Sequence, residues 1–221
     1  YLIITKKIYD KKNFSSLNKK KFVISKKLKK NYISKLKFKF VFFIHWSEYI
    51  PSYIYEKFEC IQFHSSNLPK GRGGSPIQNQ ILMGKNMTKL CAFKVVKQID
   101  GGPIYFKKNL SLKGSAADIL KRMEKLSVDI IKKIVKSKNL LLKKQTGAPT
   151  FFKRRTPKQS EINKKYFSKV DKFYDFVRML DADGYPKSFF VKNNIEFEFK
   201  NIRKLKNIYT SNVIVRTYDK N

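Results

Sequence analysis

Short apolar runs alternate with polar, lysine-rich stretches along the first half of the chain. The runs are rich in β-branched and aromatic residues, a pattern that is typical of buried strands. They predict strands at residues 1–5, 22–25, 40–46, 60–64, 90–99 and 104–110. The run at 40–46, FVFFIHW, is continuously apolar, which indicates burial on both faces, as in a parallel sheet.

Apolar residues spaced close to one helical turn apart predict helices between these strands. The predicted helices cover residues 26–37, 52–57, 76–83 and 115–138. We expect Ser52 to cap the second helix, Gly84 to end the third, and Gly114-Ser115 to start the fourth. The alternation predicts an α/β fold with a Rossmann-like, mostly parallel sheet flanked by helices.

The remainder of the chain predicts a linker followed by a smaller unit. The segment QTGAPTFFKRRTPKQS at 145–160 contains two prolines and several turn-forming residues, as linkers do. A helix at 171–180 and strands at 188–192, 195–200 and 213–217 then predict a small α+β subdomain, with a hairpin turn at 193–194. The expected division is therefore a larger domain at 1–144, a linker at 145–160 and a C-terminal subdomain at 161–221.

Polar residues that could perform chemistry follow two of the predicted strands. His64 ends the strand at 60–64 and precedes a loop rich in glycine and proline, and Asp100 precedes Gly101-Gly102. A histidine beside a partly desolvated carboxylate can exchange protons near neutral pH. Asp100 by itself could equally bond backbone amides of its own turn, and His45, inside the apolar run, is interpreted as structural.

The motifs of several common sites are missing. The chain contains no GxGxxG before a helix for a dinucleotide, no GxxxxGK[ST] for a nucleotide phosphate, and no GxSxG elbow for a serine hydrolase. Two histidines and two isolated cysteines give a zinc site little to build on, so no metal is expected. Arg72 in the glycine-rich loop could anchor that loop or bind an anionic ligand.

The charge of the chain leaves two interpretations open. The formal net charge is +34 and the pI is about 10.1, values that often indicate a nucleic-acid partner. The lysines are spread along the chain together with many Asn, Ile, Tyr and Phe residues, which favours compositional drift over a selected basic surface.

Cysteine usage and hydropathy point to a cytoplasmic protein. Cys60 and Cys91 lie in apolar runs, as reduced, buried thiols do. No apolar run approaches the length of about 20 residues needed to span a membrane, and no secretory signal opens the chain. Because the sequence begins at Tyr1, we expect further residues to precede it.

Taken together, several segments resemble the folate-dependent formyltransferases. FHSSNLPKGRGGSP and IDGGPIY match the family's central motifs in order and spacing. FFIHWSEYIP is similar to its folate-lining segment, and FKRRTPKQSEI with FVRMLDADGYP is similar to the start of its C-terminal part. The nearest resemblance is to the short, methionyl-tRNA-formyltransferase-like proteins that formylate amino sugars.

The resemblance implies roles for individual residues. The catalytic histidine and aspartate of the family fall on His64 and Asp100, whereas Gln62 occupies the position of the family's asparagine. The longer glutamine still carries an amide that can donate to an oxyanion, although Asn67 or a backbone amide could substitute for it. The residues expected at the cofactor are Phe43, Trp46, Ile50, Arg72 and Gly73.

The implied reaction moves a formyl group from 10-formyltetrahydrofolate to a primary amine. A nucleotide-linked amino sugar is the expected acceptor, because residues 151–221 form a smaller C-terminal part than the tRNA-acting members carry. Methionyl-tRNA is the alternative acceptor, which the charge favours. A basic RNA-binding protein with a decayed site is a third hypothesis, motivated by Gln62 and the charge. A homodimer is also possible.

Overall fold

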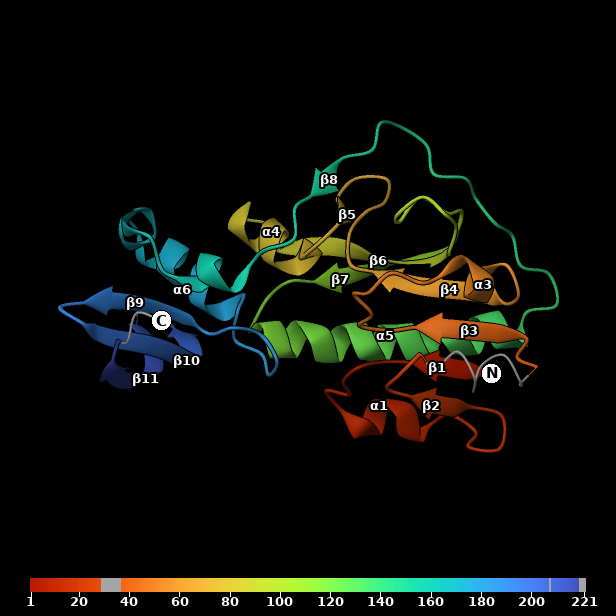
Figure 1. Cartoon of the computed structure of the whole chain (residues 1–221), viewed down its shortest axis with the longest axis horizontal. Helices are drawn as coiled ribbons and strands as arrows, with labels where there is room; N and C mark the ends of the chain where they lie inside the picture. The colour runs from red at the N-terminus through yellow and green to blue at the C-terminus, as the bar shows by residue number, and fades with distance from the viewer. Residues whose placement is uncertain (29–36, 207, 219–221) are drawn as a thin grey trace.

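The computed structural model describes residues 1–28, 37–206 and 208–218 (Figure 1). Most of the helix predicted at 26–37 lies outside the described residues. Within them, the main sheet has six strands in the order β2-β1-β3-β4-β6-β7. These strands are β1 (Leu2–Ile4), β2 (Val23–Ser25), β3 (Phe40–Phe43), β4 (Glu59–His64), β6 (Met87–Lys94) and β7 (Ile104–Ser111).

The sheet is mixed and mostly parallel. β1 pairs in parallel with β2 and with β3, and β3 pairs in parallel with β4. β6 and β7 then extend the sheet with antiparallel pairings. This arrangement confirms the predicted fold class, and it places β4 beside β6, with His64 at the end of β4 opposite Cys91.

Strand β3 is buried on both faces, as its continuous apolar run predicts. Phe40 and Phe42 belong to the hydrophobic cluster on one face of the sheet, whereas Val41 and Phe43 belong to a separate cluster on the other face. Successive side chains of a strand point to opposite faces, so one run of four apolar residues supplies both layers.

Helix α5 (Ala116–Lys136) packs along one face of the sheet (Figure 1). Its apolar stripe is buried in the larger hydrophobic cluster together with Phe42 of β3. Shorter helices are α1 (Lys11–Ser15), α3 (Ser52–Tyr55) and α4 (Pro76–Leu82). Among the described residues, no helix is both long and apolar enough to cross a membrane.

The C-terminal part has a helix packed on a second sheet. α6 (Val170–Arg178) lies against the antiparallel sheet of β9 (Ser188–Lys192), β10 (Ile195–Leu205) and β11 (Ile208–Thr217). The predicted hairpin turn is present: Asn193 and Asn194 have φ values of 49° and 58°, as a turn with two left-handed residues requires. Both β10 and β11 are longer than predicted, because exposed Lys, Asn and Ser positions weaken the pattern while the pairing continues.

Some local predictions are wrong. β6 ends at Lys94, so the approach to Asp100 is a loop rather than the predicted strand. Helix α3 has Pro51 at its N-cap and no side-chain cap bond, so Ser52 is not its cap. The two-residue strands β5 (Arg72–Gly73) and β8 (Phe151–Phe152) pair with each other, and stretches this short have no signal in the sequence.

Replacing Ser115 with alanine should destabilise α5 by about 1 kcal/mol, because Ser115 makes a capping box. Its Oγ accepts from the Asp118 amide at 3.2 Å, and Asp118 Oδ2 accepts from the Ser115 amide at 3.0 Å. The measurement is the free energy of unfolding in urea. Ser137→Ala, at the other end of α5, is the control; equal losses in the two variants would contradict the prediction.

Candidate active site

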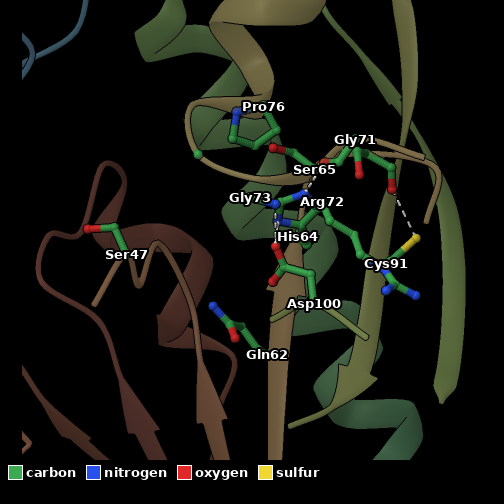
Figure 2. Close-up of polar contacts among 12 residues, drawn as sticks. Ser47, Gln62, His64, Ser65, Gly71, Arg72, Gly73, Pro76, Cys91 and Asp100 are labelled. Atoms are coloured by element: carbon green, nitrogen blue, oxygen red, sulfur yellow. Dashed lines mark hydrogen bonds and ion pairs between the residues drawn. The ribbon is translucent and has the colours of Figure 1, made fainter. Parts of the chain in front are cut away.

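Two loops that leave neighbouring strands bring His64 and Asp100 together (Figure 2). His64 ends β4, and Asp100 lies in the connection from β6 to β7. His64 Nδ1 lies 3.5 Å from Asp100 Oδ2, and both side chains are 7% exposed. The same Oδ2 accepts a hydrogen bond of 2.8 Å from the Gly73 amide. Asp100 therefore binds both the histidine and the glycine-rich loop.

The hydrogen bonds of His64 decide which ring nitrogen carries a hydrogen. Nε2 lies 2.8 Å from the carbonyl oxygen of Gly71, and a carbonyl can only accept, so Nε2 is the donor. Nδ1 then faces Asp100 Oδ2 at 3.5 Å. Among the described residues, Asp100 Oδ1 has no hydrogen-bond donor, so this oxygen remains able to accept a proton.

The glycine-rich loop is held by the segment at 143–152, here called the strap. The Gly71 amide donates to Thr150 Oγ1 at 2.8 Å, and the Arg72 amide donates to the Thr150 carbonyl at 2.9 Å. β5 then pairs in parallel with β8. Gly73 has a φ of 92°, and a Cβ at this position would lie 2.6 Å from the Phe152 carbonyl oxygen. Only glycine permits this backbone to approach the strap so closely.

A cavity of about 610 Å³ opens beside the His64–Asp100 pair. Gln62, Trp46 and Ile50 line it together with that pair. The facing wall comes from the C-terminal part of the chain and is basic and aromatic, with Arg154, Arg155 and Tyr185. Its volume is in the range of small-molecule sites, and both parts of the chain contribute to it.

The structure brings most of the predicted site residues to this cavity, but not all. Gly73, Trp46 and Ile50, which were predicted to bind the cofactor, line it. Phe43 is fully buried within the sheet and packs against Trp46, because its side chain points into the core rather than the cavity. Arg72 is also outside the lining: its guanidinium donates to Gln145, so it anchors the loop.

The side chain of Gln62 lies apart from the hydrogen bonds that join Asp100 to the glycine-rich loop (Figure 2). Its Nε2 is 3.4 Å from the Trp46 carbonyl oxygen, a long hydrogen bond that a ligand could replace. Asn67 does not substitute for it, since its Oδ1 accepts from Lys107 Nζ at 2.9 Å on the surface of the loop.

His45 makes a buried contact that the sequence did not reveal. Its Nε2 lies 3.8 Å from Oε1 of Glu124, a fully buried carboxylate on α5. Glu124 also accepts from the Tyr9 and Asp10 amides at 2.7 and 2.9 Å. Burial lowers the pKa of His45 to about 4 and raises the pKa of Glu124 above its usual value. The hydrogen bonds of Glu124 connect the loop after β1 to α5. Within the described residues, His45 Nε2 has no hydrogen-bond partner, and His45 also lines the cavity.

Neither cysteine has the properties of a reactive thiol. Cys60 and Cys91 are free and buried. Burial raises the pKa of Cys60 to about 12 and that of Cys91 to about 11, so both are thiols at neutral pH. Among the described residues, no group of three or more His, Cys, Asp or Glu side chains is arranged to hold a metal ion.

Comparisons with known proteins identify relatives of the whole chain and of its C-terminal part. Residues 157–216 match the family described as "Methionyl-tRNA formyltransferase, C-terminal domain". The methionyl-tRNA formyltransferase of Mycoplasma mycoides is 30% identical over 176 residues, which is 76% of this chain and 54% of that protein. The chain thus spans about half the length of that relative.

Solved structures extend the likeness to nearly the full length of the chain. A methionyl-tRNA formyltransferase from Clostridium thermocellum superposes with a TM-score of 0.88 and 36% identity, covering 98% of each chain. A likely sugar N-formyltransferase from Mycobacterium tuberculosis superposes with a TM-score of 0.68 and 15% identity, covering 87% of this chain and 91% of that one. At this lower identity, the second likeness establishes the fold alone.

The low pKa of His45 should make the stability of the protein depend on pH between about 6.5 and 4. An unfolded histidine titrates near 6.5, so below that pH the unfolded chain binds a proton that the folded chain excludes. The stabilising effect of neutral His45 is complete above pH 6.5 and is lost as the pH falls to about 4. The total loss is about 3 kcal/mol.

The measurement is the free energy of unfolding at several pH values for the wild type and for His45→Asn. Asparagine is chosen because residue 45 has a φ of 50°, which asparagine tolerates. The variant should show a shallower dependence in this window. Parallel curves for the two proteins would contradict the assignment.

Proposed function

The chain belongs to the folate-dependent formyltransferase family, and on that premise we propose that it transfers a formyl group from 10-formyltetrahydrofolate to a primary amine. The observation that carries this proposal is the position of His64 and Asp100. The two residues lie beside a small-molecule cavity. The loop holds one oxygen of the Asp100 carboxylate, and the other has no hydrogen-bond donor among the described residues. This arrangement suits removal of a proton from an attacking amine.

In the proposed reaction, the neutral amine forms a bond to the formyl carbon and gives a tetrahedral intermediate. The proton that the amine loses goes to Asp100 Oδ1, while His64 and the Gly73 amide hold Oδ2. The bond between the formyl carbon and N10 of the folate then breaks, and N10 takes up a proton. We assign stabilisation of the oxyanion to Gln62 Nε2 and to His64, whose Nε2–H would leave the Gly71 carbonyl to donate to the oxyanion.

The apolar part of the cavity fits the donor. Trp46 is nearly buried, and within the described residues its Nε1 has no hydrogen-bond partner. A buried donor without a partner is costly unless a ligand or water accepts from it. A planar heterocycle with ring nitrogens and a carbonyl, such as a pterin, would supply an acceptor and stack against apolar neighbours such as Ile50.

We propose an aminoacyl-tRNA as the acceptor. Two relatives that share 30% or more of their residues with this chain, from Mycoplasma mycoides and Clostridium thermocellum, are methionyl-tRNA formyltransferases. The size of the C-terminal part does not argue against tRNA, because the Clostridium thermocellum protein of that name has the same extent. Arg154 and Arg155 on the cavity wall, and the net charge of +34, favour a polyanionic acceptor.

A nucleotide-linked amino sugar, the acceptor expected from the sequence, stays the second prediction. Its phosphates could also meet Arg154 and Arg155, so the basic wall does not separate the two acceptors. The experiment supplies the purified chain with 10-formyltetrahydrofolate and follows release of tetrahydrofolate with charged initiator tRNA or with nucleotide-linked amino sugars. Turnover with tRNA should weaken steeply as salt rises, because counterions compete for the phosphates.

Each result of that experiment decides between the hypotheses. Turnover with an amino sugar and none with tRNA would replace the proposed acceptor. Salt-sensitive RNA binding with no turnover of any amine would defeat formyl transfer and favour a decayed site.

Replacement of His64 or Asp100 by alanine should lower kcat by about a hundredfold or more, since each removes a partner in proton transfer. Gln62→Leu should also lower kcat by about a hundredfold, because it removes an oxyanion donor. Binding of the donor is measured separately through the fluorescence of Trp46, the single tryptophan of the chain. Asp171→Ala, on an exposed part of α6, is the matched control. Wild-type rates in His64→Ala or Asp100→Ala would refute the assignment.

A further inference from the structure

The side chain of Gln145 connects the two loops of the site and uses all of its hydrogen-bonding groups in doing so. Its Nε2 donates to the Asp100 carbonyl at 2.7 Å and to the Gly102 carbonyl at 2.8 Å. Its Oε1 accepts from Arg72 Nε at 3.2 Å and from Arg72 Nη2 at 2.7 Å. We propose that Gln145 is the positioning residue that holds the Asp100 carboxylate in its working orientation, an inference that rests on the proposed formyl transfer.

The backbone of Asp100 needs such support. Its φ of 49° lies in the left-handed region, which is strained for a residue other than glycine. The turn is also confined on its other side, since a Cβ on Gly102 would lie 1.7 Å from the Lys94 carbonyl oxygen. The two bonds from Gln145 fix the carbonyl groups on either side of Gly101. They therefore determine the direction in which the Asp100 side chain leaves the backbone.

The other half of the Gln145 amide fixes the loop that Asp100 must meet. Arg72 is 5% exposed, and its guanidinium also lies over the ring of Phe151, 6.0 Å from the ring centre. The next residue, Gly73, donates its amide to Asp100 Oδ2. Gln145 thus contacts the backbone carbonyl of Asp100 and the side chain of Arg72, the residue before Gly73. The Asp100 carboxylate and the Gly73 amide that donates to it therefore cannot move independently.

The strap delivers Gln145 to this position through backbone pairing. Lys143 and Ile104 exchange two backbone hydrogen bonds of 2.8 and 3.0 Å at the start of β7. Farther along, Thr150 binds the glycine-rich loop. Gln145 lies between these two attachments, so its side chain is placed by pairing at both ends of the strap.

The substitution Gln145→Glu separates the donor role of the Gln145 amide from its acceptor role. The carboxylate of Gln145→Glu keeps an acceptor for Arg72 but loses both donors, and it faces the carbonyls of Asp100 and Gly102. We expect kcat to fall about tenfold, because a small misplacement of a catalytic group costs about this much or more. The KM for the folate donor and its Trp46 fluorescence titration should change less than about twofold, since Gln145 is not among the described residues that line the cavity.

The experiment compares wild type, Gln145→Glu and the control Gln159→Glu, which makes the same substitution in the short helix at Pro157–Ser160. Turnover of the wild type is established first, so its absence would fail the proposed function and not this inference. Given wild-type turnover, an unchanged kcat in Gln145→Glu would overturn the proposal. A loss of kcat that is matched by loss of folded protein at the assay temperature, measured by thermal unfolding, would also overturn it.

A second comparison tests whether Gln145 acts through Asp100. Gln145→Glu is added to Asp100→Asn, and the slow reaction is followed in single turnovers with excess enzyme. A positioning residue has nothing further to position there, so the added substitution should change the rate less than about twofold. A further tenfold loss would show that Gln145 acts elsewhere and would overturn the proposal. If Asp100→Asn gives no measurable rate, the comparison of kcat, KM and folded fraction decides.

Discussion

The Asp100 carboxylate joins parts of the chain that are distant in sequence. One of its oxygens contacts His64 at the end of β4 and accepts from the Gly73 amide in the following loop. These contacts require a left-handed backbone at Asp100 and another at Gly73, where a side chain would collide with β8. The site therefore depends on backbone geometry that two loops adopt only when they are packed against each other.

The sheet provides the rigid frame for this contact. β4 and β6 are antiparallel neighbours that hold His64 opposite Cys91, and the loop between β6 and β7 brings Asp100 to His64. Both faces of β3 are buried, and α5 covers one of them, which leaves the central strands little freedom to shift. Catalytic groups placed on strand ends inherit that rigidity, whereas the loops that complete the site need additional attachments.

Those attachments come from the strap, which connects the two parts of the chain. Lys143 of the strap pairs with Ile104 at the start of β7, and β8 of the strap pairs with β5. The strap thereby places Gln145 between the two loops. The chain then continues into Arg154 and Arg155, which form the far wall of the cavity. One segment thus supports the proposed catalytic residues and contributes the basic groups that would face the acceptor. Formation of the cavity is in this way coupled to the docking of the C-terminal part.

The sequence by itself determined most of the helices and strands and indicated His64 and Asp100 as candidate site residues. Periodicity predicted the α/β alternation, the doubly buried run at 40–46 and the long helix, because burial acts directly on local hydrophobic patterns. His64 and Asp100 stood out because His64 follows an apolar run and precedes a glycine-rich loop, and Asp100 follows an apolar run and precedes Gly101-Gly102. The family motifs then related the two residues to one reaction, and the structure places them 3.5 Å apart.

Only the tertiary structure decided which polar residues face the cavity and which hold its walls. Arg72 and Phe43 are indistinguishable in sequence from ligand-binding residues, yet one binds Gln145 and the other lies in the core. Gln145 lies in a stretch whose prolines and turn residues predicted a linker, and its bonds reach residues 43 and 73 positions away. Such contacts depend on how separate loops pack, and a local pattern of residues does not indicate a partner so distant in the chain.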